Sequence, residues 1–256
     1  MDKRINMKRF FVGIVLLLFS PVLFAQNADL FWSMLGIIND KDGYTNVREE
    51  ASVSSPIQGK VYSHQVFYIP DFADPSNNMQ EIWYSVGYEK INNSYSLSET
   101  TNSGYIHSSR ILPLTKINRL SKRTLSDNRL ILSNDSISVI FTEEPFNEAD
   151  HTIKRHPEGW LAAIDGQNPW GTDGTMPETS LASISISYKN EIYSLPKAAL
   201  SKVYELSFAE DRCGVFIDRD NALYIVMVNG DGAGAYLAIW TIVDKKLETM
   251  SLMIPF

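Results

Sequence analysis

The segment Ala235–Val243, AYLAIWTIV, places the strongest constraint on the fold, because all but one of its residues are apolar. Successive side chains of a β-strand point to opposite faces of the sheet, so a strand with this composition is apolar on both faces. Gly- and Asp-containing turns bound it at Asn229–Gly234 (NGDGAG) and Asp244–Lys246, and strands are expected on either side at Ala222–Val228 and Leu247–Ile254. The sequence therefore predicts a meander whose central strand is buried between two layers.

Strand patterns dominate the rest of the chain as well. Short apolar or alternating segments bounded by turn residues are typical of strands, and they occur at Val61–Ile69, Glu81–Tyr88, Ser136–Phe141 and Ser180–Tyr188, with Glu191–Leu195 as a hairpin partner of the last. The best helical pattern after the N-terminal region is Pro196–Tyr204, with Pro in the first turn and apolar residues at helical spacing. We therefore expect a mostly β fold with one short helix.

The N-terminus has the pattern of an export signal. Lys3, Arg4, Lys8 and Arg9 precede the apolar run Phe10–Phe24, and Ala25 supplies a small residue for cleavage before Gln26. An uncleaved anchor is the alternative. No later apolar run approaches the roughly 18 residues of a membrane span, so after cleavage we expect no transmembrane anchor and a periplasmic or secreted protein of a bacterial envelope.

Charge and cysteine content narrow the classes of partner. The chain has 23 Lys and Arg and 30 Asp and Glu residues, of which residues 1–25 contain four basic residues and one acidic residue, so the mature chain carries a net charge of −10. Such a surface repels phosphates and anionic lipid headgroups, which argues against nucleic acid and membrane partners. Cys213 is the single cysteine, which excludes an internal disulfide and fits a bacterial periplasmic protein.

The segment Asn39–Val61 (NDKDGYTNVREEASVSSPIQGKV) carries a family resemblance that continues to residue 114. The matching residues are Asp42, Gly43, Asn46, Val47 and Arg48, then Pro56, Ile57, Gly59, Lys60 and Val61, then Trp83 with Val86, then Gly104, Tyr105, Ile106 and His107. In this order and spacing they resemble a bacterial SH3-like (SH3b) domain, apart from a long insert at Asn92–Ser103. Gly43 permits the positive φ of a hairpin turn, and we expect Trp83 and Tyr105 to help fill the barrel.

The resemblance divides the chain into parts. It implies an SH3-like barrel with an N-terminal lead-in at residues 26–114, after the signal at 1–25. A basic segment at 115–135 is expected to be a linker or solvated face, and residues 136–256 a β-rich, sandwich-like domain of unknown function. The WGTDG turn with the terminal DGAGAY hairpin resembles a domain that follows SH3b modules in exported bacterial proteins and brings no known activity.

The resemblance also implies a ligand site, because SH3b domains often hold cell-wall peptide in a surface groove of aromatic residues. The residues expected to contact such a ligand are Tyr44, Asn46, Trp83 and Tyr105. For any single aromatic among them, packing in the core is the competing interpretation.

Catalytic and metal sites are poorly supported. Asp211-Arg212-Cys213-Gly214 is superficially similar to the nucleophile motif of cell-wall cysteine peptidases of the NlpC/P60 type. In that family the histidine base follows the cysteine, whereas His156 is the last histidine here. His151 and His156 lack the spacing of a zinc motif. Whether the acidic turns around Asp165, Asn168 and Asp173 bind an ion is left open. We expect no cofactor, no metal and no catalytic residue.

Three functions are compatible with these patterns. The first is an exported, non-enzymatic binding protein whose SH3b domain engages peptidoglycan peptide or an envelope protein. The second is a periplasmic inhibitor or immunity-type protein whose acidic surface blocks a basic cell-wall hydrolase or toxin. The third is an unrecognised hydrolase that uses the turns around Trp170.

Overall fold

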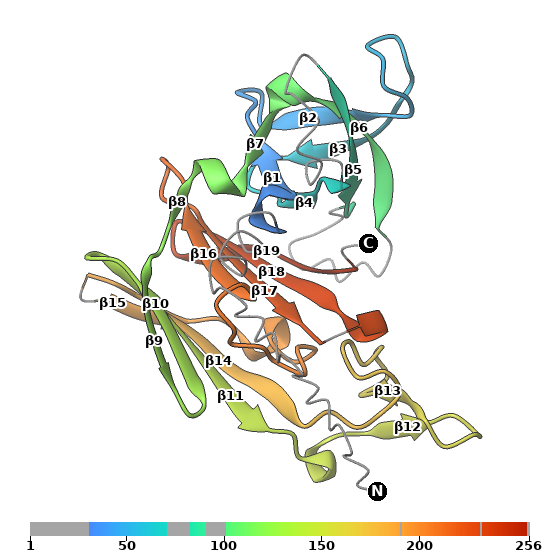
Figure 1. Ribbon diagram of the computed structural model, residues 1–256, viewed down its shortest axis with the longest axis vertical. Helices are drawn as coiled ribbons and strands as arrows, with labels where there is room; N and C mark the ends of the chain where they lie inside the picture. Colours follow the sequence, from blue (N-terminus) through green and yellow to red (C-terminus); the bar gives the residue numbers. More distant parts are fainter. Residues whose placement is uncertain (1–30, 71–81, 91–100, 190, 231, 255–256) are drawn as a thin grey trace, which may run out of the picture.

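The computed structural model describes residues 31–70, 82–90, 101–189, 191–230 and 232–254, which form a mostly β protein (Figure 1). The predicted export signal lies outside the described residues, as do most of the polar loops expected near residues 75 and 95. No helix within the described ranges is long and apolar enough to cross a membrane.

The N-terminal part is a curled, antiparallel seven-stranded sheet at one end of the molecule (Figure 1). Its strands, in spatial order, are β3 (Ile57–Tyr62), β2 (Tyr44–Arg48), β6 (Asn102–His107), β5 (Trp83–Tyr88), β4 (Phe67–Tyr68), β1 (Leu35–Ile38) and β7 (Ile111–Pro113). The sheet surrounds a small core that includes Phe67, Tyr84 and Tyr88. We call this part the barrel.

The expectation that Trp83 and Tyr105 fill this core is wrong. Side chains alternate along β5, and the buried set is Tyr84, Val86 and Tyr88, so Trp83 faces outward and is only partly buried. Tyr105 also alternates with buried neighbours on β6 and is partly buried. The aromatic residues that β5 contributes to the interior are instead Tyr84 and Tyr88, on its other face.

The central sheet has five antiparallel strands and is buried on both faces. Its strands are β19 (Lys246–Met253), β18 (Tyr236–Val243), β17 (Leu223–Asn229), β16 (Cys213–Ile217) and β8 (Asn118–Arg119). One face packs on the barrel, where Tyr224, Val226 and Leu237 form a cluster with Trp32 and Leu35. The other face contributes to the largest core of the protein. The predicted burial of the central strand of the meander, β18, between layers is confirmed.

An outer five-stranded sheet covers the second face of the central sheet. Its strands are β15 (Glu191–Ser194), β14 (Thr179–Tyr188), β11 (Ile137–Pro145), β10 (Arg129–Ser133) and β9 (Lys122–Ser126). The core between the two sheets includes Val139, Phe141 and Ile184 from the outer sheet and Trp240 from the central one. The C-terminal half is therefore a sandwich of two sheets.

Residues 118–133, which the sequence placed in a linker, instead form strands β8, β9 and β10. The physical reason is the apolar residues Leu120, Leu130 and Leu132, which are buried in the sandwich core between the basic residues. One of the basic side chains also connects β8 to the loop before β16, since Arg119 Nη2 donates a hydrogen bond to the Glu210 carbonyl at 3.1 Å.

The predicted short helix is present as one 3₁₀ turn, η5 (Lys197–Ala199), within the expected range of residues 196–204. A longer α-helix would pair the Ala199 carbonyl with the Val203 amide. Here that carbonyl accepts a hydrogen bond from Trp240 Nε1 at 2.7 Å. The Val203 amide donates instead to the Leu200 carbonyl at 3.1 Å, so the α-helical hydrogen bond between these two residues does not form.

A two-stranded hairpin, β12 (Ile153–Arg155) and β13 (Leu161–Ile164), extends from the sandwich at the end far from the barrel (Figure 1). A small cluster of Leu161, Ile164 and Tyr204 is buried at its base. Residues 31–33 are helical, and the other short elements include the 3₁₀ turns η2 (Ser108–Arg110), η3 (Leu114–Lys116), η4 (Glu148–Asp150) and η6 (Gly232–Gly234).

Candidate functional site

A surface cleft of about 710 Å³ lies on the outer side of the barrel. We call it the barrel cleft. Strand β2, the loop that follows it, the ends of β5 and β6 and the turn η2 supply its walls. The lining residues are Asp40, Asp42, Tyr44, Thr45, Asn46, Arg48, Ala51, Ser52, Val53, Trp83, His107, Ser109 and Arg110. Its volume falls within the roughly 300–1,000 Å³ typical of small-ligand sites.

Tyr44, at the start of β2, offers an aromatic ring to the barrel cleft. The turn before it contains Gly43 at φ +81°, a conformation that glycine adopts without steric cost, and this turn directs the chain into β2. Lys60 Nζ lies 3.7 Å from the centroid of the Tyr44 ring, and the Tyr62 ring centroid lies 6.4 Å away. The tyrosine is 37% exposed, so its ring is oriented by neighbours and still accessible.

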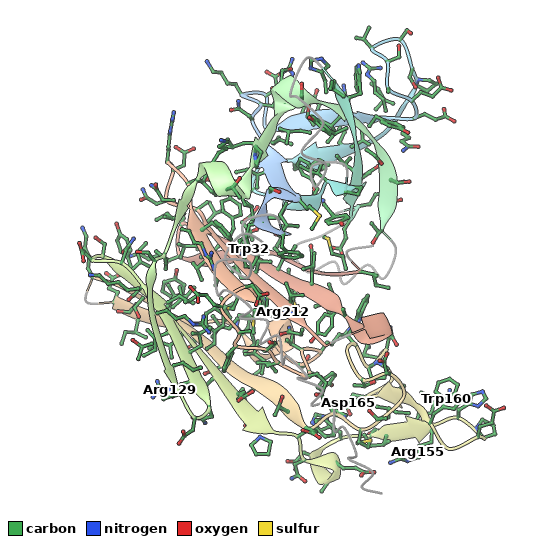
Figure 2. The ribbon with its side chains drawn as sticks, viewed as in Figure 1. Trp32, Arg129, Arg155, Trp160, Asp165 and Arg212 are labelled. Carbon is green, nitrogen blue, oxygen red and sulfur yellow. The ribbon has the colours of Figure 1, made fainter. Side chains whose placement is uncertain are left out.

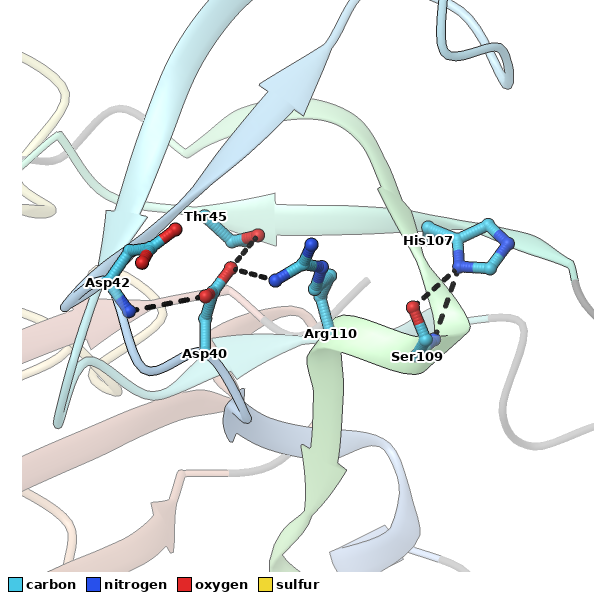
Figure 3. Close-up of polar contacts among 6 residues, drawn as sticks. All are labelled: Asp40, Asp42, Thr45, His107, Ser109 and Arg110. Atoms are coloured by element: carbon cyan, nitrogen blue, oxygen red, sulfur yellow. Dashed lines mark hydrogen bonds and ion pairs between the residues drawn. The ribbon is translucent and has the colours of Figure 1, made fainter.

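Trp83 and His107 form the second aromatic element of the barrel cleft. They are directly paired across β5 and β6, and their rings meet edge to face with centroids 5.4 Å apart. The Ser109 amide donates to His107 Nδ1 at 3.3 Å, and the Ser109 hydroxyl lies 2.9 Å from the same atom (Figure 3). Because Nδ1 is an acceptor in this arrangement, the neutral ring carries its proton on Nε2, which can donate to a ligand.

An ion pair joins two distant segments of the barrel cleft. Arg110 Nη1 donates to Asp40 Oδ2 at 2.8 Å, while the Thr45 hydroxyl and the Asp42 amide donate to the same carboxylate at 3.2 and 3.3 Å (Figure 3). The Asp40 side chain is 8% exposed, whereas that of Arg110 is 51% exposed. Asp40 therefore serves to position Arg110, whose guanidinium remains open to solvent.

Two further groups of the barrel cleft provide hydrogen-bonding capacity. Arg48 Nη1 donates to the Ser55 carbonyl at 2.6 Å, which fixes the loop after β2 and uses one of the five N–H groups of the guanidinium. The Asn46 Oδ1 atom is buried and accepts no hydrogen bond from any described residue. A ligand donor that reached Asn46 would satisfy an acceptor that the protein leaves unpaired.

Three of the four residues predicted to contact a ligand, Tyr44, Asn46 and Trp83, line the barrel cleft together. Tyr105 does not line it, although it lies on the adjacent strand β6, paired with Arg48 and Ser85. Asp40, Arg48, His107 and Arg110 also line the cleft although the sequence did not predict them as ligand contacts. Asp40 and Arg110 are 70 positions apart, and no local pattern links them.

Cys213 and the His151–Asp165 pair, which were candidates for chemistry in the C-terminal half, make structural contacts. Cys213 is fully buried in the sandwich core, and burial raises the pKa of its thiol to about 12, which disfavours the nucleophilic thiolate. His151 Nδ1 lies 2.7 Å from Asp165 Oδ2, and the hydrogen bonds from His151 and from the Thr152 amide lower the pKa of Asp165. Within the described residues, His, Cys, Asp and Glu form no group of three or more that could hold a metal ion.

Comparison of the chain with protein-family models, with curated proteins and with solved structures finds no match. The function must therefore be argued from the geometry of the site.

Proposed function

We propose that the barrel is an SH3b-like domain of an exported, non-enzymatic binding protein, and that the barrel cleft holds a short peptide. The ligand would be a peptide of the cell wall or of an envelope protein. One observation carries the proposal: Tyr44 and Trp83, two aromatic rings accessible to solvent, line one cleft together with two guanidinium groups.

The chemistry of the barrel cleft fits a peptide with a free carboxylate. The fork of N–H groups on a guanidinium matches a carboxylate in geometry and charge. Arg110 is held for this role by Asp40, and Arg48 by the Ser55 carbonyl. Aromatic rings supply apolar contact with side chains or the backbone. Cell-wall peptides carry free carboxylates and lack the continuous negative charge that the acidic protein would repel.

The test is binding of a sugar-free cell-wall stem peptide to the protein expressed from its full sequence, measured by titration calorimetry, with a pull-down on purified sacculi beside it. Trp83→Ala should weaken binding roughly tenfold, since it removes one of the two aromatic contacts. Trp160→Ala is the matched control for the sugar-free stem peptide, because Trp160 is an exposed tryptophan outside the barrel and does not line the cleft. Equal affinities for the protein and for a folded Trp83→Ala variant would contradict the proposal.

An inhibitor of a basic cell-wall hydrolase or toxin is the second candidate function. The observation in its favour is the net charge of −10 that the chain carries without residues 1–25, because such a surface attracts a basic partner. Capture of one basic enzyme from periplasmic extract, at an affinity that falls steeply with salt, together with no binding of stem peptide, would favour it over peptide binding.

A further inference from the structure

A second cleft, of about 390 Å³, lies between the β12–β13 hairpin and the part of the central sheet where β18 starts and β19 ends. We call it the hairpin cleft. Its walls come from the β12–β13 hairpin, the loop between β13 and β14, the turn η6 and the residue after β19. The lining residues are Trp160, Leu161, Ala162, Asn168, Pro169, Trp170, Gly171, Thr172, Asp173, Gly174, Gly234, Ala235 and Ile254. They include one carboxylate and no basic side chain.

Trp160 forms an exposed, rigid aromatic wall of this cleft. It lies at the outer end of the hairpin, and 47% of its surface is exposed (Figure 2). The His156 ring stacks parallel to it with centroids 4.3 Å apart and an interplanar angle of 13°, and Trp160 Nε1 donates to Glu158 Oε2 at 3.4 Å. Gly174, at φ +78°, packs close to the base of the side chain, where an added Cβ would lie 3.3 Å from Trp160 Cβ. The indole is therefore held in one orientation before any ligand arrives.

Asp173 provides a hydrogen-bonding group on a loop that the core fixes in place. Trp170 is buried against Tyr236, with ring centroids 5.8 Å apart, and the Thr172 hydroxyl donates to the Pro169 carbonyl at 2.9 Å. The Asp173 carboxylate lies over Gly234, where an added Cβ would come within 2.8 Å of Oδ1. Within the described part of the chain, the side chains of Asp173 and Asn168 take no hydrogen bond or ion pair.

This set of groups selects for one class of small molecule. An anion is disfavoured because Asp173 is the only charged group among the described residues of the lining. A metal ion would need more oxygen ligands than one carboxylate and one amide. A sugar ring has an apolar C–H face that packs on an indole and a rim of hydroxyl groups that donate to carboxylates and exchange hydrogen bonds with amides.

We propose that the hairpin cleft binds a neutral saccharide of one or two pyranose rings, with one ring stacked on Trp160 and its hydroxyl groups bonded to Asp173 and Asn168. Gly174 leaves room for the Trp160 side chain, and Gly234 leaves room for the Asp173 carboxylate. This site is independent of the barrel cleft, because it uses none of the same residues.

The experiment is a fluorescence and calorimetric titration of the protein with cellobiose, maltose and N,N′-diacetylchitobiose at up to millimolar concentrations. Choline is included because an ammonium group also suits an aromatic ring beside a carboxylate. We expect at least one disaccharide to bind and to change the tryptophan emission, and Trp160→Ala to weaken it roughly tenfold.

Asp173→Asn is the second variant, since Asp173 has φ +46° and asparagine tolerates this left-handed conformation. It should fold normally and weaken the sugar roughly fivefold, because a neutral amide accepts weaker hydrogen bonds than a carboxylate. Asp244→Asn is its matched control, as Asp244 is an aspartate at φ +48° in the turn between β18 and β19. Trp83→Ala controls for the barrel cleft.

Sugar binding that both folded hairpin-cleft variants weaken and both controls retain would establish the site. Sugar binding that persists in Trp160→Ala and Asp173→Asn would overturn the assignment of the cleft. Failure of all three disaccharides to bind, or a preference for choline, would overturn the class of ligand, and neither result depends on whether the barrel cleft binds peptide.

Discussion

Replacing Glu89 with glutamine should remove a strong dependence of stability on pH. Glu89 follows β5, where the barrel meets the central sheet, and it is 1% exposed. Its carboxyl group faces Ser251 and Leu252 of β19, yet neither oxygen accepts a hydrogen bond of normal geometry from a described residue. Burial raises the pKa of this carboxyl from 4.5 to about 8.

The size and sign of the effect follow from proton linkage. In the unfolded chain Glu89 ionises above pH 4.5, whereas in the folded protein it holds its proton up to about pH 8. The folded state therefore binds more protons in this window, and its stability falls as the pH rises. Each pKa unit corresponds to about 1.4 kcal/mol, so the loss reaches about 3 kcal/mol at pH 7 relative to pH 4.

The assay is urea unfolding of the protein and of Glu89→Gln at several pH values from 4 to 8.5, followed by tryptophan fluorescence. The variant should become more stable relative to the parent as the pH rises, by about 3 kcal/mol between pH 4 and pH 7. Glu248→Gln is the control, because Glu248 is exposed on the same strand β19 that Glu89 contacts. If the free energies of unfolding of parent and Glu89→Gln run parallel across this range, the reasoning is refuted.

Three other substitutions or treatments test the packing. Gly104→Ala should destabilise the barrel by at least about 2 kcal/mol in urea unfolding, since the new Cβ would lie 2.5 Å from Val47 Cγ1 and 2.7 Å from the Arg48 carbonyl; an unchanged midpoint would contradict this. Tyr236→Phe should cost about 2 kcal/mol, because the buried hydroxyl donates to the Tyr204 carbonyl at 2.7 Å and accepts from its amide at 2.9 Å; thermal unfolding measures the loss. The Cys213 thiol should resist aromatic disulfide reagents at pH 8 until urea unfolds the chain, and rapid labelling of the native protein would show that the sandwich core opens easily.

The layered fold could be predicted because it depends on local pattern. The composition of residues 235–243 requires apolar neighbours on both faces of a strand, whichever elements provide them. The pattern could not settle which aromatic residues enter the barrel, because Trp83 and Tyr84 are adjacent and a shift of one residue exchanges the two faces. The helix after Pro196 is also shorter than its pattern predicts, and there the Ala199 carbonyl bonds Trp240 while the Val203 amide bonds Leu200.

The candidate site was predictable only in part, for a related reason. Tyr44 and Asn46 lie two positions apart on one strand, so alternation places them on one face. The ion pair between Asp40 and Arg110 depends on how the sheet curls, and neither residue has a local signal. The strands in residues 115–135 were not predicted because basic residues dominate the composition of this segment. The leucines that pack it into the sandwich core, Leu120, Leu130 and Leu132, are spread among those basic residues.

Because the barrel packs on the central sheet, truncating the chain between them would expose apolar side chains on both fragments. Cutting the chain after residue 114 would expose Phe216, Tyr224 and Val226 on one fragment and Trp32 with Leu35 on the other. Each piece would then carry an uncovered apolar surface, a feature that promotes aggregation in fragments and transplanted domains. Neither half is a portable unit, so a graft of the barrel onto another scaffold would need a substitute for the sheet beneath it.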